Sequence, residues 1–301
     1  MLIMHAMTPA ETLMAIPNLS EGRDRARVER LRDGFAGVTV LDTHSDPDHN
    51  RSVFTAAAPQ GALADALVAL AAAAVEAIDL NRHDGLHPCV GALDVMPVVH
   101  LDDARRGAAC AEAITAAARV GGELDVPVFL YGQLATRAEH RERADLRRGG
   151  WRALAARMES GELTPDFGPP RAHPTAGAVL ATARPPLVAF NVDLDSDDVD
   201  LARAIAAAIR ESAPGGLPGV RAIGLPLAER GRAQVSTNVR DHRATPLAAI
   251  VEAVRAHAPV AEAELVGLAP EAAFEGFPAD VPLRDFDPGR HLIENALRSL
   301  S

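Results

Sequence analysis

The chain has 301 residues, of which 48% are hydrophobic but only 3% aromatic, and its formal net charge is −11. A chain of this length can bury the core of one large domain or of two ordinary ones. The negative charge argues against a nucleic-acid partner, because binding to phosphates requires a basic face. All 30 basic residues are arginine, which excludes Schiff-base chemistry and a phosphate-loop lysine.

Cysteine usage and the N-terminal segment bear on the compartment of the protein. The two cysteines, Cys89 and Cys110, match neither a metal-ligand spacing nor a disulfide framework. Residues 1–14 lack the basic and apolar regions of a signal peptide, and no stretch combines spanning length with continuous apolarity. We therefore expect a soluble, cytoplasmic protein with no membrane partner.

The first half of the chain alternates apolar runs of strand length with helical patterns. The expected strands are 12–17, 38–42, 52–57, 92–99 and 126–131, and the expected helices are 23–32, 62–78 and 102–121. Residues 18–22 are expected to form a turn and residues 43–51 a polar loop, because both are rich in turn formers. The charged run 140–148 is expected to be a solvated helix face.

A proline-rich strip, residues 164–177, separates the two halves. Its four prolines and two glycines cannot continue a helix, so we expect an irregular strip across the surface. After it, the expected strands are 187–192, 220–227, 233–239 and 264–268, and the expected helices are 197–211 and 246–257. The tail beyond Ala273 is expected to be an irregular strap that ends in a short helix.

The order β-α-β-β-α-β in the second half is that of the ferredoxin-like, or split βαβ, unit. The first half has the same order with an additional helix and strand. The sequence therefore predicts an α+β fold with two ferredoxin-like subdomains, residues 1–182 and 183–301.

The segment 81–101 is the candidate active site, because it places His83 and His87 in a Gly/Pro-rich turn just before a strand. Loops that leave a buried sheet often carry catalytic groups. A spacing of four would suit a metal pair on a helix, but Gly85 and Pro88 disfavour a helix and no third ligand is evident. We therefore expect no metal.

Long motifs in the chain resemble those of glutamate formiminotransferases. In the first half they are 16–22, 46–55, 82–88, 91–97, 126–132 and 165–169, and in the second half 184–192, 216–220, 233–238 and 264–268. The motifs occur in the family's order and extend over about residues 16–270. Several are six or more residues long, so the resemblance is specific.

The resemblance implies transfer of a formimino group from N-formimino-L-glutamate to N5 of tetrahydrofolate, a step of histidine degradation and one-carbon metabolism. Tetrahydrofolate would be the co-substrate. The family fold implies two ferredoxin-like subdomains with a ligand channel between them, and a homodimer. The length of this chain corresponds to the transferase without the cyclodeaminase domain.

The resemblance also assigns residues. His87 corresponds to the family's catalytic acid–base histidine. The folate-binding segment corresponds to Gly168, Pro169, Pro170, Arg171, Ala172, His173, Pro174, Thr175, Ala176 and Gly177. Further candidates for substrate binding or orientation are His83, His44, Asn50, Arg51 and Arg184. Arg51 is able to bind a carboxylate in a bidentate manner; the alternative is an ion pair with Asp46 or Asp48.

One position departs from the family pattern. The family reads His-Pro-Arg where this chain has His87-Pro88-Cys89, so a small and mostly apolar residue replaces a permanent cation. A second hypothesis is therefore a non-catalytic or substrate-altered paralogue that binds folate or a small acid. Two further alternatives are a covalent mechanism of Cys89 with His87 and a metal-assisted hydrolase that uses both histidines.

Overall fold

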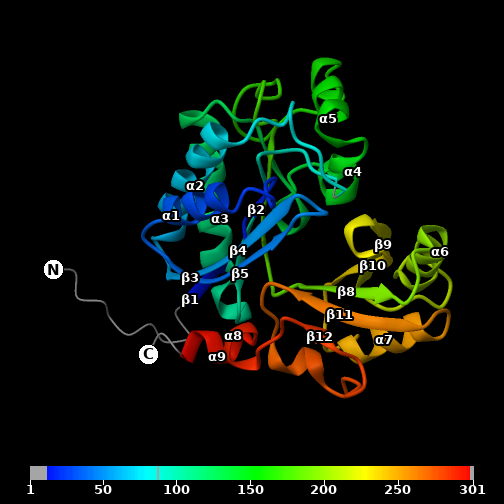
Figure 1. The fold of residues 1–301 in the computed structure, drawn as a ribbon. Coiled ribbons are helices and arrows are strands. Elements are labelled where there is room, and N and C mark those ends of the chain that lie inside the picture. The colour runs from blue at the N-terminus through cyan, green and yellow to red at the C-terminus, as the bar shows by residue number, and fades with distance from the viewer. Residues whose placement is uncertain (1–11, 87, 299–301) are drawn as a thin grey trace. The chain divides into compact units, whose positions relative to one another are not determined.

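The computed structural model describes residues 12–86 and 88–298 (Figure 1). The chain forms two compact units: unit 1 extends to Pro185 and unit 2 begins at Pro186. Each unit contains one β-sheet with helices, so the α+β class is confirmed. No helix of the described residues is long and apolar enough to cross a membrane.

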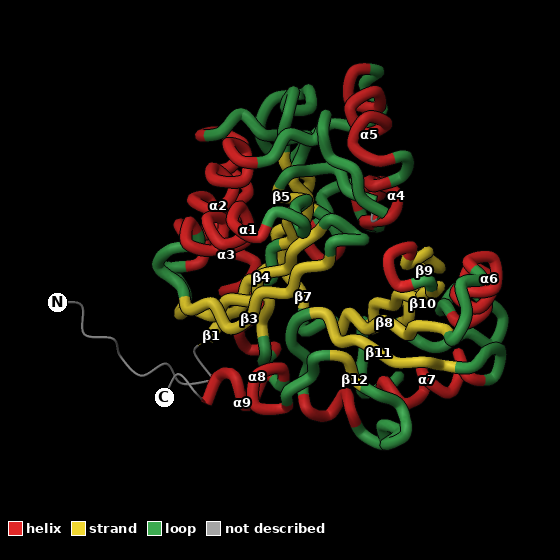
Figure 2. Tube along the Cα trace, in the orientation of Figure 1, coloured by secondary structure: helices red, strands yellow, loops and turns green. Residues whose placement is uncertain are grey.

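Unit 1 contains a seven-stranded sheet (Figure 2). Its strands are β1 (Thr12–Ala15), β2 (Asn18–Leu19), β3 (Thr39–Asp46), β4 (Arg51–Pro59), β5 (Leu93–His100), β6 (Val128–Leu130) and β7 (Val179–Arg184). Both β1 and β2 lie between β4 and β5 and are antiparallel to them, while β3 pairs with the outer side of β4. β7 adds to β5 in parallel and β6 adds to β7 in parallel.

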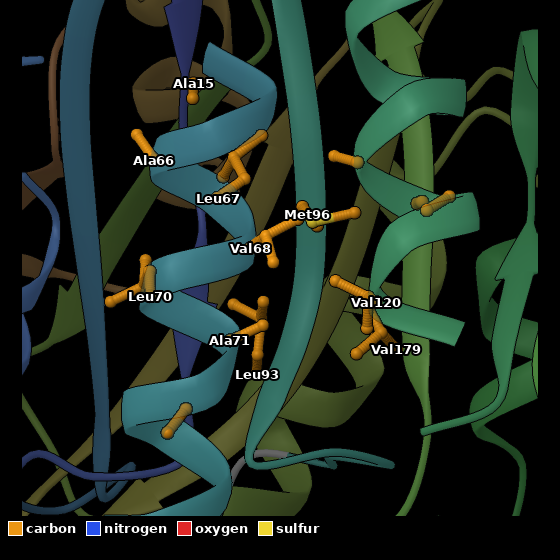
Figure 3. Packing of buried hydrophobic residues seen from close by; sticks show 14 of the residues in the cluster. Ala15, Ala66, Leu67, Val68, Leu70, Ala71, Leu93, Met96, Val120 and Val179 are labelled. Carbon is orange, nitrogen blue, oxygen red and sulfur yellow. The ribbon is translucent and has the colours of Figure 1, made fainter. Parts of the chain in front are cut away.

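Helices pack on both faces of this sheet. They are α1 (Arg25–Gly34), α2 (Leu63–Ala77), α3 (Arg106–Glu123), α4 (Arg143–Arg147) and α5 (Gly150–Glu159). Alternate strand residues such as Phe54 form one core with α1, α2 and α3, whereas Phe129 and Leu180 pack with α4 and α5 on the opposite face. Figure 3 shows Val68 of α2 beside Met96 of β5 in the larger core.

The N-terminus of α2 is stabilised by a residue of another helix. Its N-cap residue, Ala62, has no side chain able to accept a hydrogen bond. The carboxylate of Glu112 on α3 accepts hydrogen bonds from the backbone N–H of Ala64, at 2.7 Å, and of Gly61. Glu112 is 5% exposed, so a buried negative charge lies at the positive end of the α2 dipole.

We expect Glu112→Ala to lower the free energy of unfolding by about 1.5–3 kcal/mol, because charged hydrogen bonds to two buried N–H groups are lost. Urea unfolding would measure this change. Glu76→Ala, an exposed change on α2, is the control and should stay within about 0.5 kcal/mol of the parent. Equal stability of the two variants would contradict a capping role for Glu112.

Unit 2 contains a five-stranded sheet in the order β12-β11-β8-β10-β9. Its strands are β8 (Val188–Leu194), β9 (Val220–Leu227), β10 (Arg232–Val239), β11 (Val260–Val266) and β12 (Leu283–Arg284); its helices are α6 (Val199–Ile209), α7 (Leu247–Arg255), α8 (Pro288–His291) and α9 (Ile293–Arg298). β8 to β11 are mutually antiparallel where they pair, and β12 is parallel to β11. Phe190 packs in one core with Ile205 of α6 and Val251 of α7.

Short 3₁₀ turns connect several of these elements. They are Asp103–Arg105, Gly132–Leu134, Ala138–His140, Ala228–Arg230 and Glu271–Phe274. The expected strand 220–227 and the helices expected at 62–78, 197–211 and 246–257 are confirmed, with ends that shift by up to two residues. The tail ends in a short helix as expected, and it also contributes the short strand β12.

Two local expectations were wrong, and two elements were not foreseen. Residues 18–19 form β2 instead of a turn, and residues 43–46 continue β3, which leaves only 47–50 as the hairpin turn. β7 and α5 were not expected. β7 has two alanines and an arginine among its six residues and so lacks a clear strand signature, while α5 begins at Gly150, directly after Gly149, and a pair of glycines is typical of a turn.

The charged run 140–148 is a solvated helix face only in part. Its exposed charged residues are Arg141, Glu142, Asp145 and Arg148. By contrast, His140 is fully buried and Arg147 is 7% exposed. Both have acidic partners far away in the sequence, Asp166 and Asp94. A charge pattern read along the chain contains no information on such distant partners.

Candidate active site

Asn50 links three segments at the turn between β3 and β4. Its Oδ1 accepts from the backbone N–H of Gly22 at 3.0 Å, and its Nδ2 donates to the carbonyl of Asp84 at 3.0 Å. Its φ of 46° lies in the left-handed region, which asparagine tolerates better than most residues. One side chain therefore links the β3–β4 turn to Gly22 and to the candidate segment at Asp84.

His83 lies beside this junction. Its Nδ1 is 3.3 Å from Nδ2 of Asn50. Burial lowers the pKa of His83, so its imidazole is neutral at pH 7. A Cβ at Gly85 would lie 2.5 Å from the carbonyl oxygen of His49 and 3.0 Å from Nε2 of His83, so the loop approaches the hairpin too closely for a side chain there.

The other histidines of this region are placed differently. His87 lies outside the described residues. His44 lies on β3, opposite Val53 of β4. His49 is buried, with its Nδ1 3.5 Å from Asp46 Oδ2, and its backbone N–H donates to Oδ1 of the same carboxylate at 2.8 Å. Asp46, considered above as a partner of Arg51, is thus held by His49.

Asp94 occupies a β-bulge in β5. Asn18 pairs with Val95 but Leu19 pairs with Leu93, so Asp94 is an additional residue on its strand. Its carboxylate is 2% exposed and accepts from the backbone N–H of Val90 at 2.8 Å. It also forms a buried ion pair with Arg147 of α4.

Two further arginines, Arg51 and Arg143, lie near this ion pair, and Arg184 lies near Arg143. Burial and the nearby charge of Arg147 lower the pKa of Arg51 to about 9, and burial lowers that of Arg184 to about 10. Burial also lowers the pKa of Arg147. Arg143 of α4 adds to the unfavourable positive charge at all three of these groups. We call Arg51, Arg143, Arg147 and Arg184 the arginine cluster.

Cys89 borders this cluster and is unsuited to be a nucleophile. Burial, followed by the charge of Asp94, raises the pKa of its thiol to about 11. The opposing effects of the Ser20 hydrogen bond, Arg147 and Arg51 are smaller. Since the thiolate is the reactive form, this environment argues against the covalent alternative.

We expect Cys89 to resist alkylation in the folded protein. A rise from 9.0 to about 11 reduces the thiolate fraction at pH 7.5 about a hundredfold. A Cys110→Ser variant, with Cys89 as its only thiol, would be treated with iodoacetamide at pH 7.5 with and without urea. The folded protein should react at least about a hundredfold more slowly. Equal rates would contradict the buried, protonated thiol.

The predicted folate strip is an irregular loop fixed to the candidate loop. The carbonyl oxygens of Pro174 and Thr175 accept from Asn81 Nδ2, at 2.9 Å, and from Leu80 N–H, at 2.8 Å. His173 and Gly177 exchange two backbone hydrogen bonds of 2.8 and 3.0 Å. Ala176 and Gly177 are buried, while Gly168, Pro170, Arg171 and Pro174 are exposed and Pro169, Ala172, His173 and Thr175 are partly exposed.

A close backbone contact sets the start of this strip. Gly168 has a φ of 81°, and a Cβ on Gly121 of α3 would lie 2.6 Å from its backbone nitrogen. Only glycine at both positions permits this approach without displacement. The strip is thus positioned by α3 at one end and by the loop at residues 80–81 at the other.

His140 and Asp166 form a pair that the sequence did not indicate. His140 Nδ1 lies 3.2 Å from Asp166 Oδ2, and its ring packs edge-on against Phe129 with centroids 5.2 Å apart. Asp166 also accepts from Leu130 N–H at 2.8 Å and from the hydroxyl of Thr136. Burial opposes ionisation of Asp166, but these hydrogen bonds prevail and lower its pKa.

The structure therefore brings together Asn50 and His83, and separately Arg51 and Arg184 with Arg143 and Arg147. Arg143 and Arg147 were missed because they lie in a run that resembles a solvated helix. Their spacing of four, which places both on one face of a helix, was the available signal. Within 12–86 and 88–298, no group of three or more His, Cys, Asp or Glu side chains is arranged to hold a metal ion.

Comparison with known proteins identifies the chain's relatives. The formiminotransferase domain, N-terminal subdomain, matches residues 12–184, and the formiminotransferase domain matches residues 189–276. A glutamate formimidoyltransferase of Streptococcus pyogenes serotype M1 is 37% identical over 297 residues, 96% of this chain and 99% of the relative. A glutamate formimidoyltransferase of Thermoplasma acidophilum is 39% identical over 269 residues, 86% of this chain and 88% of the relative.

The formimidoyltransferase-cyclodeaminase of Gallus gallus is 38% identical over 277 residues, 88% of this chain but 51% of the relative. Matches across both units define the chain as a one-carbon group transferase. It belongs to the formiminotransferase family, and the relatives from Streptococcus pyogenes and Thermoplasma acidophilum, which match over 99% and 88% of their length, are glutamate formimidoyltransferases.

Proposed function

We propose that this enzyme transfers the formimino group of N-formimino-L-glutamate to N5 of tetrahydrofolate, in histidine degradation and one-carbon metabolism. The observation that carries the proposal is the 37% identity to a glutamate formimidoyltransferase over 99% of that relative. Tetrahydrofolate is then a co-substrate. We also retain a cytoplasmic homodimer as part of this proposal.

In the proposed reaction, N5 of tetrahydrofolate attacks the formimino carbon and forms the new C–N bond. His87 accepts the proton that N5 loses and then donates a proton to the glutamate nitrogen as the old C–N bond breaks. One imidazole suits both steps because its pKa lies near neutral pH. His83, neutral and adjacent to Asn50, has the role of orienting the loop.

We propose that both units are ferredoxin-like subdomains, 1–182 and 183–301, with a ligand channel between them. The support in unit 2 is the element order β-α-β-β-α-β with strand order β11-β8-β10-β9. In unit 1, β1 and β2 act as the first strand, and the order β3-β4-β1/β2-β5 is the corresponding arrangement. β6 and β7 extend that sheet.

The strip from Gly168 to Gly177 is the proposed folate-binding segment. Most of it is at least partly exposed, yet hydrogen bonds fix it at several points, so it offers a preorganised surface. Of the remaining candidates, Arg51 and Arg184 are proposed to bind substrate carboxylates. His44 stays a candidate for substrate orientation.

The test is to mix purified protein with tetrahydrofolate and N-formimino-L-glutamate and to follow the absorbance of 5-formiminotetrahydrofolate. We expect product only when both substrates are present. N-acetyl-L-glutamate, which carries no formimino group, is the control donor and should give none. Absence of product, in a preparation that binds tetrahydrofolate, would contradict the proposed reaction.

A second candidate is a paralogue that binds folate or a small acid without this catalysis. The observation that favours it is the uncharged Cys89 thiol, at the position where the family carries arginine. Tetrahydrofolate binding without turnover would support it. Activity gained by Cys89→Arg would then assign the loss to this position.

A further inference from the structure

The arginine cluster carries more positive charge than its surroundings neutralise. Arg147 pairs with Asp94. In the described part of the chain, no carboxylate forms an ion pair with Arg51 or Arg143. A cluster of like positive charges in a chain whose net charge is −11 is not a consequence of overall composition.

The fold directs these groups to one face of the unit 1 sheet. Tyr131 directly follows β6, and Arg184 is the last residue of β7. Tyr131 lies two residues after Phe129 and Arg184 four residues after Leu180, so both lie on the sheet face that α4 and α5 cover. Leu146 anchors α4 on the same face. Arg147 then extends from α4 to Asp94, and Arg143 lies one helical turn before it, with Arg51 at the start of β4 close to both charges.

Two buried guanidinium nitrogens in this cluster have no hydrogen-bond partner among the described residues. They are Nε of Arg51 and Nε of Arg147, and Arg147 as a whole is 7% exposed. Leaving buried donors of a cation unsatisfied costs free energy, so native proteins retain them mainly where a function requires it. A planar anion with two oxygens matches the donor geometry of arginine.

We propose that Arg51, Arg143 and Arg147 bind a carboxylate of the amino-acid donor. This inference rests on the proposed function and assigns Arg143 and Arg147 to the same reaction. The location favours the donor over folate. Cys89, two residues from His87, borders the cluster, and in formiminoglutamate a carboxylate lies only a few bonds from the reacting carbon. The carboxylates of folate lie beyond the aminobenzoyl group, far from N5.

The test compares Arg143→Gln with Arg148→Gln. Arg148 is the matched control because it neighbours the same helix but is 71% exposed and pairs with Asp145. We expect Arg143→Gln to raise the KM for formiminoglutamate about 10- to 100-fold, with kcat and the Kd for tetrahydrofolate within about threefold. Arg143→Lys, which keeps the charge, should recover part of the loss.

Calorimetric binding of L-glutamate, which needs no turnover, separates this inference from the proposed reaction. We expect glutamate to bind the parent protein and Arg148→Gln, and to bind Arg143→Gln at least about tenfold more weakly. If glutamate binds in this pattern but no formimino group is transferred, the carboxylate site is supported and only the proposed transfer reaction is overturned. If Arg143→Gln leaves both the KM for formiminoglutamate and the binding of glutamate unchanged, the carboxylate site is overturned. It is also overturned if Arg143→Gln weakens only the binding of tetrahydrofolate.

Discussion

Replacement of His87 by alanine is expected to lower kcat for formimino transfer by about 10²- to 10⁴-fold, the usual contribution of a general acid–base group. The reason is that both proton transfers lose their carrier, whereas the groups proposed to bind substrates stay in place. The KM for formiminoglutamate should therefore change by less than about threefold. Steady-state kinetics with both substrates would measure these effects.

Two additional measurements sharpen the His87 test. Free imidazole should restore part of the activity of His87→Ala, because it supplies the missing proton carrier. Arg82→Ala is the control in the same loop, since the Arg82 side chain is 89% exposed, and it should retain the parental kcat. Full activity in His87→Ala would exclude the assigned role.

Asp94→Ala is expected to lower the free energy of unfolding by about 3–5 kcal/mol, because it leaves the buried Arg147 charge without its partner. The backbone N–H of Val90 would lose its acceptor as well. Urea unfolding followed by fluorescence of Trp151, the single tryptophan, would measure the effect.

The double variant Asp94→Ala/Arg147→Met tests the cause of this loss. It removes the unpaired charge and should be more stable than Asp94→Ala alone. Asp145→Ala removes an exposed partner of Arg148 and should cost no more than about 1 kcal/mol. If Asp94→Ala and Asp145→Ala were equally stable, the buried ion pair would not contribute as argued.

The sequence predicts those parts of the fold that depend on local pattern. The helix at 62–78 is rich in Ala and Leu, and the strand at 220–227 has clear boundaries. The loop 81–89 and the strip 164–177 are recognisable because glycine and proline restrict their backbone. By contrast, β7 lacks a strand signature of its own and depends on pairing with β5 and β6.

The candidate site is predictable only in part, for a related reason. Arg51 was selected from a polar motif, but its neighbours Arg143 and Arg147 lie more than ninety residues away. The ion pair of Arg147 with Asp94 spans 53 positions. Sequence periodicity indicates which side a residue faces within its own element, but not which distant residue it meets.

The extra residue Asp94 in β5 reverses the sheet face toward which the following side chains of the strand point. Before it, Leu93 faces the core formed with α1, α2 and α3; after it, Val95 faces the core under α4 and α5. The strand is thus anchored by apolar contacts in both layers, one on each side of Asp94. The position of the carboxylate is consequently fixed by the register of the sheet itself, and the cations gathered around it are arranged before any substrate arrives.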